Sequence, residues 1–267
     1  MVQRPRRRFD LRKTLFILPN LITLSSIFCG FDSMRLAAAA QSDDDYFAAA
    51  LLLVFAMFFD MLDGRVARMT RTQSAFGLQI DSLADVVSFG AAPALLVYQW
   101  SLHSLGTAGL AAAFLFLASG AVRLARFNVL SMGEQGKPTK PSKYLVGLPI
   151  PGAAGILISI VVADHAVAGD LGAARYAVPV LAVTLGLSFL MVSTIKFRSF
   201  KEIKLNGRSL AFVAFMVGSS VFVSMRFKPA FVLVWLLGMY VVLAVLETLA
   251  GVLRRRPRQR NSVPPPA

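Results

Sequence analysis

The chain has 267 residues, 56% of them hydrophobic and 16% charged, with a formal net charge of +14. Soluble domains carry about 25% charged residues, so the composition excludes an ordinary soluble protein and indicates a polytopic membrane protein. The basic residues stand in short runs beside apolar segments, which favours anionic lipid headgroups over nucleic acid as their partner. The single cysteine, Cys29, excludes an intramolecular disulfide.

Apolar stretches close to the ~20 residues needed to cross a bilayer recur along the chain. Unsatisfied backbone groups are costly in lipid, and the runs are continuous rather than alternating, so helices are expected and a barrel is not. We predict an all-α integral membrane protein with about eight transmembrane helices, at residues 14–38, 46–69, 75–100, 107–132, 144–164, 174–196, 209–226 and 229–253. The expected domain organisation is a basic segment (1–13), one transmembrane domain (14–253) and a basic, Pro-rich tail (254–267).

The segments between these predicted helices alternate in charge. The second connection carries Arg65, Arg68 and Arg71, whereas the first, residues 41–45, carries aspartates and no basic residue. Both tails and the fourth and sixth connections are also basic, and the remaining connections are poor in basic residues. Because basic loops stay on the cytoplasmic side, we expect both termini and the even-numbered loops to face the cytoplasm.

Four carboxylates lie in or beside the second and third predicted helices. A charge at that depth is costly unless it pairs, binds an ion or faces a cavity. Asp60 and Asp63 are three residues apart, and Asp81 and Asp85 are four apart, so each pair shares one helix face. A short connection makes the two helices antiparallel neighbours, so both pairs are expected to converge on one pocket.

Four converging carboxylates repel one another, and pairing with Arg65 and Arg68 would leave negative charge in excess. Divalent cations resolve that excess, and oxygen ligands without His or Cys favour Mg²⁺ or Mn²⁺. Two such ions can polarise a diphosphate. The small residues Gly64, Ala67 and Gly77 would let a substrate approach the helix backbone, and Arg68 could bind phosphate oxygens.

Other interpretations stay open on the residues alone. The glycines can serve helix packing, which is common in membranes, and the acids can form a structural ion-pair network. Intramembrane acids also mark the path of a cation transporter or channel. A transporter would spread its acids through the membrane depth, whereas these four crowd the cytoplasmic ends of two adjacent helices.

The spacing of these residues resembles the CDP-alcohol phosphatidyltransferase signature, D-x2-D-G-x2-A-R-x8-G-x3-D-x3-D, at every fixed position. The matching residues are Asp60, Asp63, Gly64, Ala67, Arg68, Gly77, Asp81 and Asp85. The resemblance implies a helical bundle with a dinuclear metal site open to the cytoplasmic leaflet. It implies that Asp60, Asp63 and Asp81 bind metal. Asp85 would contact metal and act as the general base, and the other four residues would contact the cytidine diphosphate.

Further segments resemble the phosphatidylserine synthase branch of that family, namely residues 81–94, 123–128 and 147–151. This resemblance implies CDP-diacylglycerol and L-serine as substrates, phosphatidylserine and CMP as products, a role in phospholipid biosynthesis, and a homodimer. A sibling enzyme that uses glycerol phosphate, inositol phosphate or choline is the alternative.

Three polar residues are candidates for the acceptor site. Arg123 and Arg126 are three residues apart near the cytoplasmic end of the fourth predicted helix. They can meet the serine carboxylate, which neutral acceptors lack, unless they only snorkel to the interface. Asn128 can hydrogen-bond the serine amine or a phosphate.

The first predicted helix opens with residues 19–23, Pro-Asn-Leu-Ile-Thr, which are similar to the first-helix motif of many family members. Asn20 and Thr23 are three residues apart and can reach the cytidine. Helix capping and interhelical hydrogen bonding are the alternative roles for both.

Overall fold

The computed structural model describes residues 11–70, 74–131, 144–166, 174–198 and 207–226, with 231–232, 234–239 and 241–242 near the C-terminus. The predicted basic tail at 254–267 and most of the predicted basic segment at 1–13 lie outside the described residues. So does the basic loop between the fourth and fifth predicted helices.

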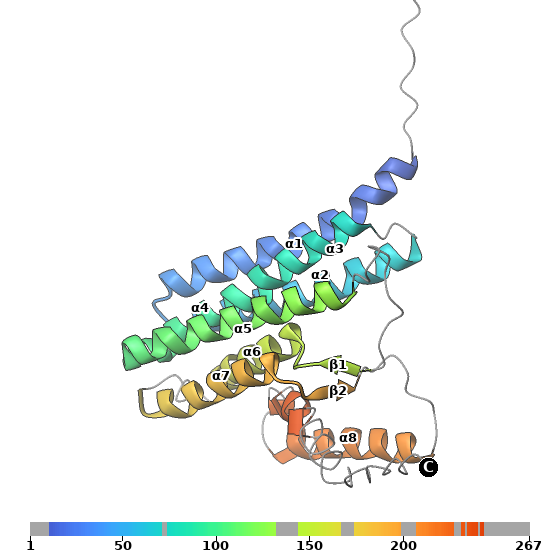
Figure 1. The fold of residues 1–267 in the computed structure, drawn as a ribbon. Helices are drawn as coiled ribbons and strands as arrows, with labels where there is room; N and C mark the ends of the chain where they lie inside the picture. The colour runs from blue at the N-terminus through green and yellow to red at the C-terminus, as the bar shows by residue number, and fades with distance from the viewer. Residues whose placement is uncertain are drawn as a thin grey trace, which may run out of the picture.

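Helices that lie side by side make up most of the described chain (Figure 1). They are α1 (Leu11–Ala39), α2 (Asp43–Met69), α3 (Ala75–Asp85), α4 (Ala92–Trp100), α5 (Thr107–Ser131), α6 (Ile150–Ala166), α7 (Ala177–Val192) and α8 (Gly207–Arg226). The 3-10 turns η2 (Leu102–Leu105) and η3 (Ala174–Tyr176) lead into α5 and α7. The prediction of a helical membrane protein is confirmed.

The third predicted helix is one span built from three pieces. The π-helical segment η1 (Val86–Ala91) joins α3 to α4 without a break. Four stretches are long and apolar enough to cross a membrane: Leu18–Ala39, Asp43–Met69, Phe76–Trp100 and Thr107–Leu130. Helices α6 and α7 are apolar but shorter. The chain is therefore embedded in a membrane, and a total of eight spans stays a prediction.

Two predicted helix boundaries are wrong, because residues at the start of 144–164 and at the end of 174–196 form strands. The strands are β1 (Tyr144–Val146) and β2 (Lys196–Arg198), paired antiparallel. Gly147, at φ +81°, turns the chain after β1, and its N–H donates to the carbonyl of Ile195 at 2.8 Å. Only glycine adopts this conformation without steric cost. The resulting ribbon lies at the end of the bundle where α1 begins (Figure 1).

The predicted acidic loop at 41–45 is largely the first turn of α2, which begins at Asp43 rather than at residue 46. The backbone N–H groups of Gln41 and Ser42 donate to Oδ2 of Asp45 at 2.9 and 3.0 Å. Carboxylates in the first turn also interact favourably with the helix dipole. The aspartates therefore start the helix, and the side chain of Asp44 is still 86% exposed.

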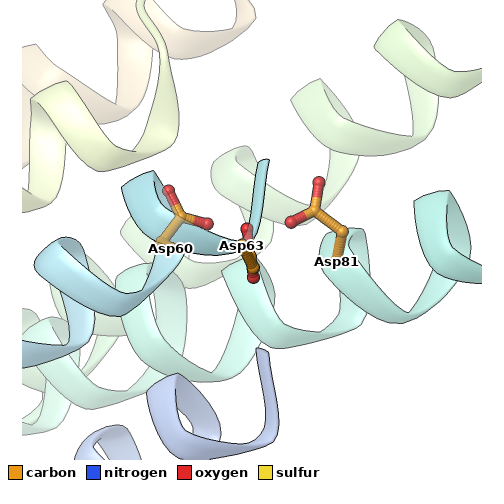
Figure 2. A group of neighbouring side chains, drawn as sticks. All are labelled: Asp60, Asp63 and Asp81. Atoms are coloured by element: carbon orange, nitrogen blue, oxygen red, sulfur yellow. The ribbon is translucent and has the colours of Figure 1, made fainter. Parts of the chain in front are cut away.

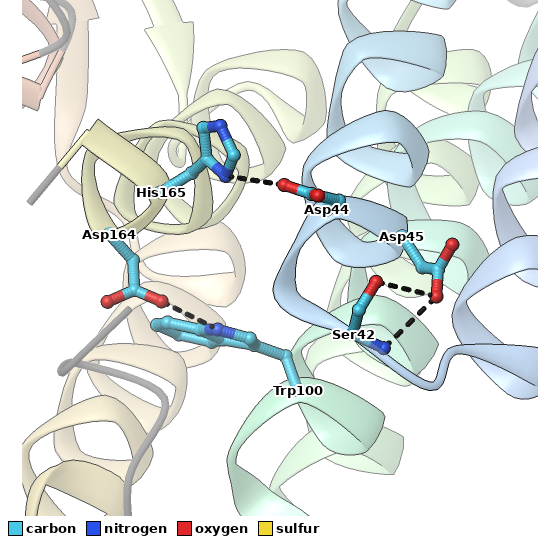
Figure 3. A network of polar contacts seen from close by, with 6 residues as sticks. All are labelled: Ser42, Asp44, Asp45, Trp100, Asp164 and His165. Atoms are coloured by element: carbon cyan, nitrogen blue, oxygen red, sulfur yellow. Dashed lines mark hydrogen bonds and ion pairs between the residues drawn. The ribbon is translucent and has the colours of Figure 1, made fainter. Parts of the chain in front are cut away.

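Polar contacts tie the start of α2 to the ends of α4 and α6 (Figure 3). They lie at the end of the bundle opposite the ribbon (Figure 1). Trp100 Nε1 donates to Oδ2 of the buried Asp164 at 3.1 Å. The ring of His165 stacks on Phe47 with centroids 4.1 Å apart, and its Nδ1 lies 3.6 Å from Oδ1 of Asp44. An apolar core fills the bundle between this end and the ribbon end, with Leu53, Phe89, Leu96 and Phe116 among its fully buried side chains.

Candidate active site

Helices α2 and α3 bring the aspartates together toward the ribbon end of the bundle. Asp60 and Asp63 lie in α2, and Asp81 and Asp85 lie in α3. Helix α3 begins after Ser74, whose hydroxyl accepts a hydrogen bond from the N–H of Gly77 at 3.0 Å and so caps the helix. Figure 2 shows Asp60 and Asp63 of α2 beside Asp81 of α3.

Three of these carboxylates form a compact group. Asp60, Asp63 and Asp81 each offer one oxygen, and the three atoms lie within 4.8 Å of one another. Asp63 is 4% exposed, and the other two are partly buried. Carboxylates this close, inside a membrane protein, repel one another unless cations neutralise them. All donors are oxygen, the kind that Mg²⁺ and Mn²⁺ prefer, so these residues fit a divalent metal.

Asp85 lies one turn beyond Asp81 and is not a member of that three-carboxylate group. Its side chain lies close enough to Asp60 and to Arg123 of α5 to interact with both electrostatically. Among the described residues, none supplies a hydrogen-bond partner to the buried Oδ1 of Asp85. Native structures leave few buried polar atoms unsatisfied, so this oxygen is available to accept a proton or contact a cation.

Helix α1 packs along α2 and places its two candidate residues differently. The Thr23 hydroxyl donates to Oδ2 of Asp63 at 2.6 Å, and Thr23 is 4% exposed. Asn20 lies toward α3, since a Cβ added at Gly77 would be 4.0 Å from Oδ1 of Asn20. Thr23 therefore contacts a motif aspartate in this structure, and its predicted contact with the cytidine stays a prediction.

The small motif residues let polar side chains pack closely beside the acids. A Cβ added at Gly64 would lie 3.7 Å from Nη1 of Arg68, so this guanidinium extends over Gly64. Arg68 is exposed, whereas Gly64 and Ala67 are partly buried. At Gly77, an added Cβ would lie 3.2 Å from the capping Ser74 Oγ. A side chain at Gly77 would press on the cap that starts the acid-bearing helix.

The two candidate arginines have different surroundings, although they are one helical turn apart. Arg123 is 8% exposed, it interacts electrostatically with Asp85, and its guanidinium carbon lies 5.5 Å from the ring centroid of Phe127. Arg126 donates from Nη1 to the carbonyl of Val192, at the C-terminal end of α7, at 3.4 Å. Arg123 thus belongs to the acid site, and Arg126 faces α7.

Sequence reasoning missed Ser82, which follows a motif aspartate directly. Asn128 Nδ2 donates to Ser82 Oγ at 2.9 Å, and the Ser82 hydroxyl donates to the carbonyl of Leu78 at 3.0 Å. Asn128 therefore joins α5 to α3 beside Asp81. The available signal was a hydroxyl side chain directly beside the motif acid.

The amino-acid sequence is similar to those of known proteins. A profile of the family described as CDP-alcohol phosphatidyltransferase matches residues 16–192. A Helicobacter pylori protein named CDP-diacylglycerol--serine O-phosphatidyltransferase is 37% identical over 238 residues, covering 88% of this chain and 92% of that protein. A Bacillus subtilis protein of the same name is 34% identical over 186 residues, covering 69% of this chain and 92% of that protein. The chain therefore belongs to the CDP-alcohol phosphatidyltransferase family.

Proposed function

We propose that the chain transfers the phosphatidyl group of CDP-diacylglycerol to L-serine, giving phosphatidylserine and CMP. The observation that carries the proposal is the similarity to proteins named for this reaction, which extends over 88% of the chain for the Helicobacter pylori protein. The acid group of α2 and α3 lies inside the matched residues 16–192, so the similarity covers the site itself.

Asp60, Asp63 and Asp81 are the proposed metal ligands, with Asp85 as a further contact, and two ions of Mg²⁺ or Mn²⁺ are the proposed cofactors. When bound, such cations supply positive charge that neutralises a diphosphate and stabilises the attacking and leaving oxygens. The compact group of three carboxylate oxygens within 4.8 Å supports this proposal.

The proposed contacts of the cytidine diphosphate are Gly64, Ala67, Arg68, Gly77 and Asn20. The exposed Arg68 supports the assignment, because a guanidinium can form paired hydrogen bonds with phosphate oxygens. Gly64 and Gly77 are both partly exposed beside the acids, and neither carries a side chain that would keep a ligand from the backbone. Asn20 lies next to Gly77 and so borders the same surface.

Asp85 is the proposed general base. The serine hydroxyl gives its proton to the Asp85 carboxylate while the serine oxygen bonds to the phosphorus that carries diacylglycerol. The bond from that phosphorus to the bridging oxygen breaks, and the electron pair leaves with CMP. The buried Asp85 Oδ1, which accepts no hydrogen bond from the described residues, supports the role of proton acceptor.

Arg123 is the proposed partner of the serine carboxylate. It is buried and lies close enough to the proposed base to interact with it electrostatically. A serine held by Arg123 would therefore present its hydroxyl near Asp85. Arg126 and Asn128 are engaged with Val192 and Ser82, so we propose for them a smaller, indirect share in acceptor binding.

We place the acid end of the bundle at the cytoplasmic face of an inner membrane. Arg65 and Arg68 follow the acids in α2, and basic residues mark cytoplasmic segments and meet anionic headgroups. The basic ends (1–13 and 254–267), the single catalytic domain (14–253) and a homodimer are proposed on the sequence alone.

The test is CMP release by the purified protein in detergent with CDP-diacylglycerol, Mn²⁺ or Mg²⁺, and one acceptor at a time. Serine-dependent release that EDTA abolishes is expected. Arg123→Gln should raise the KM for serine far more than Arg126→Gln, because only Arg123 lies at the acids. Release with glycerol phosphate, inositol phosphate or choline but not with serine would refute the acceptor and keep the metal chemistry.

A further inference from the structure

We infer that Thr23 is a positioning residue of the metal site, which orients Asp63 rather than contacting the nucleotide. The inference rests on the metal site of the proposed function. Its basis is the contact between Thr23 Oγ1 and Asp63 Oδ2, 2.6 Å long and made between two residues that are each 4% exposed. The contact joins α1, which carries none of the acids, to the most buried carboxylate of the group.

The single hydroxyl proton of Thr23 has two acceptors within reach. One is the carbonyl of Pro19, one turn back in α1, at 3.0 Å, and the other is the Asp63 carboxylate. Hydrogen bonds to an ionised acceptor are shorter and about twice as strong as neutral ones. The distance from Thr23 Oγ1 to Asp63 Oδ2 is shorter than that to the Pro19 carbonyl, as this difference in strength predicts. The hydroxyl therefore donates its proton to the Asp63 carboxylate. With Oδ2 held, the plane of the Asp63 carboxylate is fixed relative to Asp60 and Asp81.

Helix α1 is held in place independently of Thr23, one turn deeper in the bundle. The Ser26 hydroxyl donates to the carbonyl of Ala56 in α2 at 3.2 Å, and the Ser88 hydroxyl of η1 donates to the carbonyl of Ser26 at 3.0 Å. At Gly30 the backbones come closer still, since an added Cβ would lie 2.9 Å from Ser88 Cα. Loss of the Thr23 hydroxyl should therefore leave α1 in register and release only the carboxylate.

Residues that orient a metal ligand by hydrogen bonding usually change metal affinity about 10- to 100-fold when replaced. Thr23→Val keeps the shape of the side chain and removes the donor, so it should weaken Mn²⁺ binding within that range. Thr23→Ser keeps the hydroxyl and should bind Mn²⁺ as the unaltered protein does. Asp63→Asn removes a proposed ligand itself and shows how far Mn²⁺ affinity falls when a ligand is lost.

A matched control exists in α7. Thr184 is 1% exposed, and its hydroxyl donates to the carbonyl of Val180 at 2.8 Å, away from the acids. Thr184→Val makes the same buried substitution and should leave Mn²⁺ affinity unchanged. Ser26→Ala is the second control, because it loosens α1 without touching an aspartate, and it should lower thermal stability more than metal affinity.

The experiment titrates purified protein in detergent with Mn²⁺ and follows free Mn²⁺ by its electron paramagnetic resonance signal, without substrates or turnover. Weaker binding in Thr23→Val, restored in Thr23→Ser, with Thr184→Val unchanged, supports the inference. Unchanged affinity in Thr23→Val, or an equal loss in Ser26→Ala, would overturn it while the metal site stands. Failure of the unaltered protein to bind Mn²⁺ or Mg²⁺ would overturn the metal site and this inference together.

Discussion

Replacing Asp85 with asparagine separates proton transfer from metal binding at this site. The substitution keeps the size and shape of the side chain and removes its ability to accept a proton. Asp85 interacts with Asp60 on one side and Arg123 on the other, and its buried Oδ1 has no partner among the described residues. The amide removes one negative charge from a crowded group but also the charge that faces the buried Arg123, so the stability of the folded protein has to be measured beside its activity.

A positioned general base contributes about 100- to 10,000-fold to rate, or about 2.7 to 5.4 kcal/mol of transition-state stabilisation. Asp85→Asn should lower kcat for serine-dependent CMP release by a factor in that range. The KM for CDP-diacylglycerol should change little, because the three grouped carboxylates are intact. Asp63→Asn should instead lose activity through loss of Mn²⁺ binding.

The assay measures CMP release and Mn²⁺ affinity on the same preparations, with the thermal unfolding midpoint as the check on folding. A fall in kcat smaller than about tenfold would be too little for a general base and would refute that role. A loss of Mn²⁺ affinity equal to that of Asp63→Asn would show that Asp85 binds the metal as strongly as the grouped carboxylates do, and the fall in kcat would then follow from metal loss rather than from a missing base.

Two further substitutions test contacts around the site. Asn128→Ala and Ser82→Ala should lower kcat similarly and non-additively, with a coupling of about 0.5–3 kcal/mol in a double-mutant cycle, because the 2.9 Å hydrogen bond between them joins α5 to α3 beside Asp81. A near-neutral Ser82→Ala would return Asn128 to direct substrate contact. Gly147→Ala should lower the unfolding midpoint more than Gly106→Ala. Both glycines have positive φ, which costs about 1–2 kcal/mol for other residues, but only at Gly147 would the added Cβ press on a carbonyl, that of Met191. Equal losses would contradict the contact.

Hydropathy and spacing predicted the helical segments and the sharing of helix faces by the acids, because both depend on residues near in sequence. The compact group formed by Asp60, Asp63 and Asp81 follows from their spacing and from a short connection between the two helices. The ribbon of β1 and β2 escaped prediction because it depends on a turn at Gly147 and on pairing between strands far apart in the chain.

The partner of each polar side chain could not be predicted in the same way. Arg123 and Arg126 share one helix face in sequence, yet Arg126 meets the end of α7, whose position no local pattern encodes. Asn20 and Thr23 likewise look equivalent, and the crossing of α1 over α2 assigns Thr23 to Asp63. Tertiary packing decides these contacts, which a family motif does not specify.

The position of the polar groups along the bundle favours an enzyme site over a pathway for ions across the membrane. The acids lie toward one end, and the polar contacts of Trp100 and His165 lie at the other. Between them, α2, η1 and α4 bury apolar side chains, including Leu53, Phe89 and Leu96, each 0% exposed. A cation crossing the membrane here would meet this core, where charge is costly. A lipid-linked diphosphate needs only a one-sided site, because its headgroup can meet the acids while its acyl chains stay in the bilayer.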